Sequence, residues 1–372
     1  MPLAATVLAL GFATRTSFIV TPVTRQASSP LFTREDRPSW PSSSSSSRSG
    51  LHHTHASEKS SAITFPSLTL VAAFAGLALP QTLAPLGSLA VFQGGLWVLM
   101  LSMGLSLTMA DLRRAALSPK ELLLNALLCF GAMPLVAVLI AKLLVLPPGT
   151  AAGLVLIGSV SGGQASNLCA LLAGGDLALS VVLTVGTTLL GVIATPAMVS
   201  VLLGTTVAVD AAAVFLSIAR LVLLPVVLGI AASEKKPALV SRMRPVLPRL
   251  GIAALLVLVA GGSANAATLL LGTPGAWKAH AASLVLPLGG GLVAFVASKA
   301  ARLPERSVRT VTIETTIKSP TLAFVLARKH FVDPAVAAAP AASMVWLAAI
   351  GAAIASAWGL FPAAEVDGPG SS

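Results

Sequence analysis

Two short polar stretches lie inside otherwise apolar segments, and both contain residue types that can bind a small ion. The first reads SGGQASN and contains Ser166 and Asn167, and the second reads IETTIKSP and contains Glu314 and Lys318. Hydroxyl, amide and carboxylate oxygens are hard ligands that suit a hard cation such as sodium. A charged side chain near the middle of a membrane span is costly and marks a functional position. These residues therefore indicate binding of an ion and a small charged solute.

Both stretches also contain residues that interrupt a helix. Gly162 and Gly163 favour irregular backbone in the first stretch, and Pro320 in the second has no amide hydrogen. Irregular backbone at membrane depth is tolerated where it is enclosed in protein or lines a cavity. Unwound carbonyls and half-helix ends at that depth can bind ions and carboxylates. The alternative is that the glycines only allow close helix packing, but Ser166 and Asn167 beside them favour a site.

Two further hydroxyls follow the first stretch at helical spacing. Ser180 and Thr184 lie one turn apart and could add oxygen ligands to the same site. Helical Ser and Thr also bond to carbonyls of their own helix, which is the alternative for this pair. Cys129 and Cys169 fall inside apolar segments without metal-ligand spacing, so free buried thiols are expected.

The elements around these residues are expected to be membrane-spanning helices. The chain has 372 residues, of which 55% are hydrophobic and 10% charged, and its mean hydropathy is +0.90. A soluble domain of this size would need more charge. The net charge of +11 is explained by basic loops that set membrane topology, so no nucleic-acid partner is expected. Breaks at Pro, Gly and charge clusters predict about ten spans: 63–80, 88–110, 120–146, 150–173, 176–204, 210–232, 247–271, 277–300, 306–329 and 334–360.

A weak internal repeat relates the two halves of this region. LVAVLIAKLLVLP (135–147) aligns without gaps on LVAFVASKAARLP (292–304), and the two copies close the third and eighth predicted spans. A repeat of five spans inverts the second copy relative to the first, a plan common among secondary transporters. We therefore expect an all-α transporter domain over 62–362, with one repeat over about 63–204 and another over about 210–360.

The two ends of the chain differ in composition from this domain. Residues 1–61 combine a short apolar start with a basic stretch rich in Ser and Thr, which predicts a targeting peptide and disordered tail. Such a peptide suits a plastid, with the inner envelope as the expected membrane. The mitochondrial inner membrane and a merely disordered tail are the alternatives. Residues 363–372 are expected to be a second disordered tail.

The quoted motifs resemble those of the bile acid:sodium symporter family. SGGQASN, the following GDLALSVVLT and ATP, MGLSLTMADL and IETTIKSPTLAFVLARKHF carry this resemblance, which covers most of residues 88 to 350. It implies ten helices in two inverted five-helix repeats, with a panel of spans one, two, six and seven facing a core that contains two crossing broken helices. It also implies a first sodium site formed by the following residues: Ser166, Asn167, Ser180, Thr184 and Glu314.

The sequence departs from the family pattern at a second ion site. The family's Gln and Asn on the ninth helix are Lys318 and Ser319 here, and a Gln on the third span is Cys129. The Lys318 ammonium could fill this altered site and compensate Glu314, one turn away. The resulting hypothesis is that one sodium ion is moved per cycle, or that coupling to sodium is lost.

The resemblance also places a substrate site at the crossing. Its residues would be Gly163, Gln164, Ser319 and Leu347, of which Gln164 and Leu347 replace family residues. A small organic anion, such as a monocarboxylate or 2-oxo acid, is expected because half-helix amino ends point at it.

These observations predict a monomeric secondary transporter in a lipid bilayer. It would couple a small organic anion to sodium by alternating access, with no cofactor other than sodium as the coupling ion. A sodium-independent or proton-linked carrier, in which Lys318 replaces a bound cation, is the first alternative. A receptor or scaffold that does not transport is a remote one. An intramembrane enzyme is not expected, because the spans lack a nucleophile–base set and a metal motif.

Overall fold

The computed structural model describes residues 67–109, 113, 118–163, 165–204, 210–243, 246–272 and 277–361. The predicted tails, 1–61 and 363–372, lie outside these residues, as does Gln164. The helical elements are Ser67–Ala78, followed by α3 (Pro80–Leu83), η1 (Ala84–Gly87), α4 (Leu89–Ser106), α6 (Pro119–Leu127), η2 (Leu128–Ala132), α7 (Met133–Leu143), α8 (Pro148–Ser159), α9 (Ala165–Leu172), α10 (Leu177–Leu203), α11 (Ala211–Ile218), η3 (Ala219–Leu223), α12 (Leu224–Lys235), α13 (Pro237–Met243), α14 (Leu247–Gly272), α15 (Trp277–Ala300), α16 (Glu305–Thr316), α17 (Pro320–His330), η4 (Pro334–Ala337) and α18 (Ala338–Gly359).

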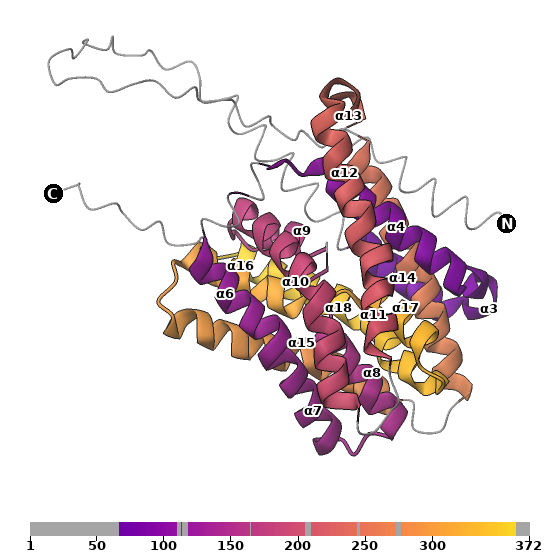
Figure 1. The fold of residues 1–372 in the computed structure, drawn as a ribbon. Coiled ribbons are helices and arrows are strands. Elements are labelled where there is room, and N and C mark those ends of the chain that lie inside the picture. Colours follow the sequence, from indigo (N-terminus) through magenta and orange to yellow (C-terminus); the bar gives the residue numbers. More distant parts are fainter. Residues whose placement is uncertain are drawn as a thin grey trace, which may run out of the picture.

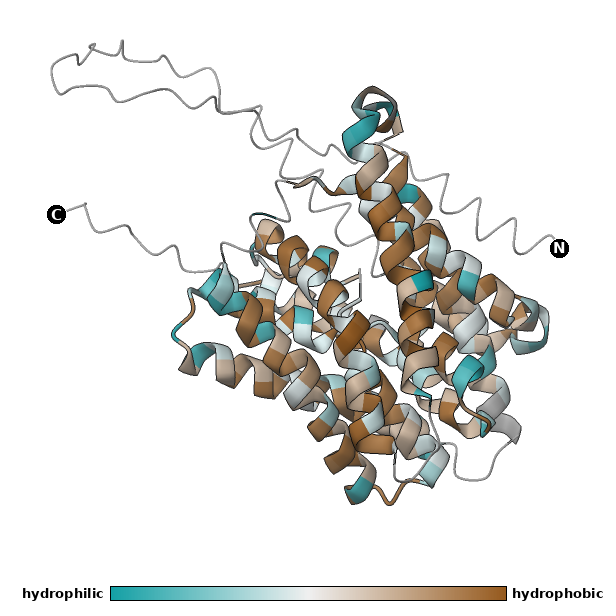
Figure 2. Ribbon diagram, in the orientation of Figure 1, coloured by the Kyte–Doolittle hydropathy of each residue, from teal (hydrophilic) through white to brown (hydrophobic). Residues whose placement is uncertain are grey.

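Seven helical spans in the described residues are long and apolar enough to cross a membrane. One of them runs from Pro119 to Leu143, and its exposed leucines are spaced by four residues, or once by eight, where position 131 is a glycine: Leu123, Leu127, Leu135, Leu139 and Leu143. This spacing forms one stripe on a helix, and a stripe of exposed leucines suits contact with lipid. Hydrophobic residues cover most of the helices, whereas hydrophilic ones are prominent at α13 (Figure 2).

The all-helical membrane fold is confirmed, and the first predicted span, 63–80, ends at a sharp bend. The helix Ser67–Ala78 meets the segment Pro80–Gly87 at 108°. Pro80 is the first residue of α3, and a proline at this position starts a new helix more readily than it continues one. The arrangement of ten helices in two inverted repeats stays a prediction.

The helices pack as two groups (Figure 1). In the first group, which we call the panel, α4 packs against α12 and α14, and α14 packs against α3. In the second group, which we call the core, α15 packs against α7, α16 and α18, and α10 packs against α6, α8 and α9. α11 and η3 continue α12 as one span and belong to the panel. The groups touch mainly where α18 meets α14, where α10 meets α11 and where α17 meets α4. The polar stretches both belong to the core, so the core holds the candidate site.

Candidate ion and substrate site

The two polar stretches meet in the middle of the core and bond to each other. The backbone N–H of Gly163 donates to Ile317 O (2.8 Å), and the N–H of Ser319 donates to Ser161 O (3.1 Å). Gly162 and Lys318 face each other as an isolated antiparallel bridge. The unwound backbone groups therefore satisfy one another, which removes much of the cost of breaking two helices in a membrane.

Each break has a local cause in the sequence. α8 ends at Ser159 and α9 begins at Ala165, so Gly162 and Gly163 lie between the two half-helices. A Cβ atom at Gly163 would lie 2.5 Å from Lys318 O, a distance that requires the backbone to move. Pro320 is the first residue of α17, where its missing N–H costs no helical bond. Glycine thus allows the close approach, and proline restarts the helix beyond it.

Glu314 lies next to this crossing and accepts hydrogen bonds from three hydroxyls. Its side chain is 0% exposed. Ser166 Oγ donates to Oε1 (2.8 Å) and Thr184 Oγ1 donates to Oε2 (2.9 Å), and Ser180 Oγ also donates to Oε1. A buried carboxylate is stable only with such compensation. Three donors from two other helices therefore surround the acid.

Asn167 completes the group of five predicted ion ligands. Its Oδ1 lies 2.9 Å from Ser180 Oγ and 3.0 Å from Thr184 Oγ1, close enough to accept from both. Thr184 Oγ1 is also 2.9 Å from Ser180 O, so the bond to its own helix exists as well. Each hydroxyl has one hydrogen to give, and these hydroxyls face more acceptor oxygens than they have hydrogens. The excess of oxygen lone pairs fits a hard cation such as sodium.

Lys318 points away from Glu314. Its side chain is 1% exposed, and its ammonium donates to Cys129 O (3.0 Å) and lies 5.8 Å from the centroid of the Phe130 ring. The ion pairs among the described residues do not include one between Lys318 and Glu314. Any compensation of Glu314 by Lys318 therefore acts without an ion pair, because the lysine side chain extends toward the third span.

The acceptor for Lys318 comes from a π-helical turn. In η2 the N–H of Met133 donates to Leu128 O, five residues earlier. The next residue, Pro134, has no N–H to give to Cys129 O. This carbonyl is thereby left available inside an apolar helix, where it needs a donor. Cys129 thus contributes its backbone oxygen to the altered site. Its thiol is buried and is not in a disulfide.

Sequence reasoning missed one polar residue beside this site, an asparagine of the third span. Asn125 is fully buried, and its Oδ1 accepts from Thr315 Oγ1 (3.1 Å). Its Nδ2 has no hydrogen-bond partner among the described residues. An asparagine within the apolar run of the third span was the available signal, since polar side chains in spans are costly unless they have a role.

A cavity lies between the panel and the crossing. It holds about 700 Å³ of empty space, including the part open to solvent. Three predicted substrate residues, Gly163, Ser319 and Leu347, line it. The remaining walls are mostly apolar: Leu96, Leu99, Met100, Leu255, Val259, Ile317 and Met344. The half-helices α9 and α17 both begin at its edge, and free N–H groups at a helix start favour an anion.

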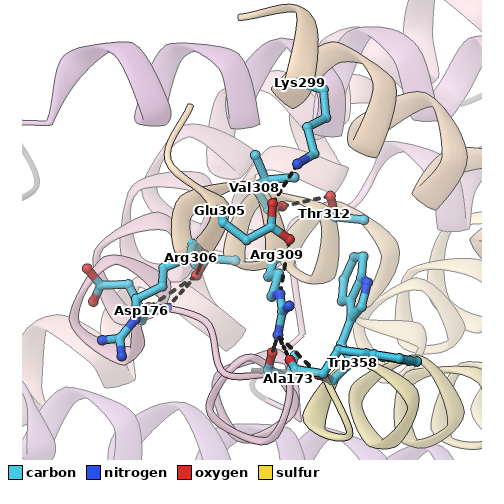
Figure 3. Close-up of polar contacts among 11 residues, drawn as sticks. Ala173, Asp176, Lys299, Glu305, Arg306, Val308, Arg309, Thr312 and Trp358 are labelled. Carbon is cyan, nitrogen blue, oxygen red and sulfur yellow. Dashed lines mark hydrogen bonds and ion pairs between the residues drawn. The ribbon is translucent and has the colours of Figure 1, made fainter. Parts of the chain in front are cut away.

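Arg309 connects several chain segments at the end of the core where α16 begins (Figure 3). Its Nη1 donates to Ala173 O (2.7 Å), Trp358 O (3.1 Å) and Phe361 O (2.9 Å). Its Nε contacts Glu305 (3.2 Å), which also bonds to Lys299. Cations are favourable at carboxyl ends of helices. One guanidinium thus joins the chain after α9, the end of α18 and the start of α16.

We expect Arg309→Ala to destabilise the core without removing any ion ligand. Losing a buried, charge-assisted donor and leaving carbonyls unpaired costs about 3 kcal/mol, which thermal unfolding of the purified protein in detergent would detect as a lower Tm. Arg309→Lys keeps the charge but loses the planar fork, so its Tm should fall in between. Equal Tm values for all three proteins would contradict this role.

Comparison with known proteins identifies a family and several relatives of this chain. The model of the Sodium Bile acid symporter family matches residues 94–271. The probable sodium/metabolite cotransporter BASS1, chloroplastic, of Arabidopsis thaliana is 37% identical over 266 residues, which cover 71% of this chain and 65% of the relative. The BASS3 protein of Oryza sativa subsp. japonica, also named a probable sodium/metabolite cotransporter, is 31% identical over 321 residues, covering 82% and 74%. The uncharacterized sodium-dependent transporter YocS of Bacillus subtilis is 29% identical over 300 residues, covering 79% and 90%.

The chain spans just under two thirds of the length of the BASS1 relative. The names of the relatives describe transporters, which supports the predicted function class and argues against an enzyme. Most of the motifs that carry the resemblance fall within the region matched by the family model, and the second broken helix lies beyond it. The chain belongs to the sodium bile acid symporter family.

Proposed function

We propose that this protein couples the movement of a small organic anion to sodium across a plastid membrane. The observation that carries the proposal is the buried Glu314 carboxylate with the hydroxyls of Ser166, Ser180 and Thr184 and the amide oxygen of Asn167 around it. When sodium binds there, it supplies positive charge that neutralises the acid. The protein's part is to hold oxygens from three chain segments in one place before the ion arrives.

The substrate would bind in the cavity with its charged end at the crossing. Gly163 and Ser319 line the cavity beside the starts of α9 and α17, whose N–H groups suit a carboxylate. The apolar walls suit a carbon chain. A monocarboxylate or 2-oxo acid has both parts, and sodium at Glu314 would favour the anion electrostatically.

Alternating access is supported by the unequal contacts on the two sides of the crossing. Leu99, Met100 and Leu255 line the cavity and come from the C-terminal half of α4 and the N-terminal half of α14. Toward the other side, the ring of Phe92 of the panel contacts the ring of Phe324 of the core in a tilted arrangement, with 4.6 Å between ring centroids. Ser217 of the panel bonds to Lys329 of the core (2.9 Å). In this arrangement the core would rock against the panel and expose the crossing to each side in turn.

The membrane we propose is the plastid inner envelope, with the protein acting as a monomer. The chloroplastic relatives and the composition of residues 1–61 support the plastid. Fractionation of envelopes with an antibody against the mature protein would separate the inner envelope from the mitochondrial inner membrane.

Uptake of labelled carboxylates into proteoliposomes tests the function. Pyruvate, other 2-oxo acids, glycolate and pantothenate would be compared with and without an inward sodium gradient. We expect at least one of them to accumulate only with sodium. Ser180→Ala should weaken the apparent sodium affinity by roughly 10- to 100-fold, the usual effect of losing a partner of an ion site. Thr187→Ala is the control, because the Thr187 hydroxyl bonds to backbone carbonyls of its own helix.

The second candidate is a carrier that does not use sodium, and it rests on the buried charge of Lys318. A lysine that had replaced sodium at Glu314 should contact that carboxylate. Lys318 instead bonds to Cys129 O, and the three hydroxyls remain on Glu314, so we prefer sodium coupling. Equal uptake with and without sodium, unaffected by Ser180→Ala, would favour the second candidate.

A further inference from the structure

We propose that the Lys318 ammonium is a built-in cation of the core, so that the carrier moves one sodium ion with one singly charged anion and no net charge. This inference rests on the proposed function and specifies its stoichiometry and substrate charge. It depends on where the buried charges of the described residues lie, and on which of them are paired.

The surroundings of Lys318 are those of a bound cation. The ammonium is held by the Cys129 carbonyl, which the η2 turn leaves available, and lies near the Phe130 ring. Carbonyl oxygens and ring faces both attract positive charge. With its side chain 1% exposed, Lys318 keeps this position by its covalent attachment and cannot leave during a transport cycle.

Three charged residues of the described chain are buried: Arg309, Glu314 and Lys318. Arg309 forms an ion pair with Glu305 in the first turns of α16. Glu314 and Lys318 remain at the crossing, one negative and one positive, in the same moving group. The empty core therefore carries no net charge at its centre. Moving an uncompensated charge through a membrane is costly, so this balance lets the empty core return.

The same balance fixes what a loaded core can carry. One sodium ion and one singly charged carboxylate leave the centre neutral, whereas a second sodium ion leaves it positive and a dicarboxylate leaves it negative. The cavity walls fit a singly charged anion. Lys318 is the one charged residue among the described lining residues, and its ammonium is directed to the third span. A second carboxylate would thus lack a partner there.

Accumulation in proteoliposomes measures the stoichiometry directly. With a tenfold inward sodium gradient, one sodium per anion allows about tenfold accumulation and two allow about 100-fold. An imposed inside-negative potential of about 100 mV should leave the one-sodium accumulation unchanged, whereas one net positive charge per cycle would change it about 50-fold. Binding of labelled sodium to the purified protein, expected at one ion per chain, gives a readout that does not depend on transport.

Variants of Lys318 test its role as the internal cation. Lys318→Met should lower sodium-driven uptake at least tenfold and make the remaining uptake sensitive to potential, while Lys318→Arg should keep uptake independent of potential. Lys142→Met, a change at an exposed lysine of α7, is the matched control. If Lys318→Met fails to fold, the wild-type sodium number and the Lys318→Arg variant still decide the question.

Two kinds of result would overturn the proposal. The first is 100-fold accumulation, two bound sodium ions, or potential-dependent uptake of a monocarboxylate by the wild type. The second is a folded Lys318→Met protein with unchanged uptake and unchanged potential dependence. Either would leave sodium symport intact. Absence of any sodium-driven accumulation in the wild type would instead count against the proposed function itself.

Discussion

Replacing Glu314 with Gln should abolish sodium-driven uptake and remove the stabilisation of the protein by sodium. The substitution keeps the size of the side chain but removes the negative charge that three hydroxyls surround. Losing an outer partner of a metal ligand already costs 10- to 100-fold in affinity, so losing the charged ligand should weaken sodium binding by about 100-fold or more. The measurement is the Tm of the purified protein over a sodium series, alongside uptake.

A protein with Gln at this position can still fold, because the amide oxygen can accept from Ser166 and Ser180 and the amide nitrogen can donate to Thr184 Oγ1, whose own hydrogen can go to Ser180 O. Glu121→Gln, in the first turn of α6, is the matched control and should retain the sodium response. Choline replaces sodium at constant ionic strength, which separates sodium binding from general screening. A Glu314→Gln protein that accumulates substrate with sodium as well as the wild type would show that the ion binds elsewhere.

Glu314 and its partners could be found from sequence because charged and polar residues are unusual inside apolar spans. A carboxylate in an apolar span is costly, and SGGQASN is polar at the same expected depth. Ser180 and Thr184 were placed by helical spacing and by resemblance, and the structure brings both to the acid. That meeting joins residues more than 100 positions apart, so spacing alone could not establish it.

Lys318 shows where the sequence was insufficient. One-turn spacing was the basis for expecting Lys318 to compensate Glu314, but the backbone unwinds after Thr316, so helical spacing does not place the two side chains. The partner that Lys318 uses is a carbonyl made available by the π-helical turn before Pro134. Such a turn has no distinct residue pattern. Arg309 presents the same difficulty, because its partners include backbone oxygens of Ala173 and Trp358.

Hydropathy predicted the long spans well and predicted the broken helices less well. The α8 and α17 half-helices have 12 and 11 residues, which is shorter than the roughly 20 residues that cross a hydrocarbon core. Their existence was inferred from Gly and Pro inside longer runs. The bend after Ala78 lies at the end of the first predicted span, 63–80, where Pro80 and the polar residues Gln81 and Thr82 follow the apolar run.

Gly163→Ala should disrupt the crossing and with it both the stability and the sodium response of the protein. The added Cβ would lie 2.5 Å from Lys318 O, so the two unwound segments would have to separate. Separation would lengthen the bond from Gly163 N–H to Ile317 O and shift Ser166 away from Glu314. Backbone displacement in a packed interior typically costs about 1–3 kcal/mol or more, so we expect a clearly lower Tm and uptake reduced at least tenfold.

The effect of Gly163→Ala should be specific to the crossing, and other glycines of the same fold provide the comparison. Gly94 on α4 has no atom within 4 Å of an added Cβ, so Gly94→Ala should leave Tm and uptake near wild type. Gly162→Ala is intermediate, because its Cβ would lie 3.3 Å from Glu314 Oε2 and would press on the carboxylate rather than on backbone. Its main effect should therefore be on sodium affinity. If Gly163→Ala matched Gly94→Ala in both measurements, the two stretches would not pack as closely as the bonds between them require, and the oxygen cluster at Glu314 would need another support.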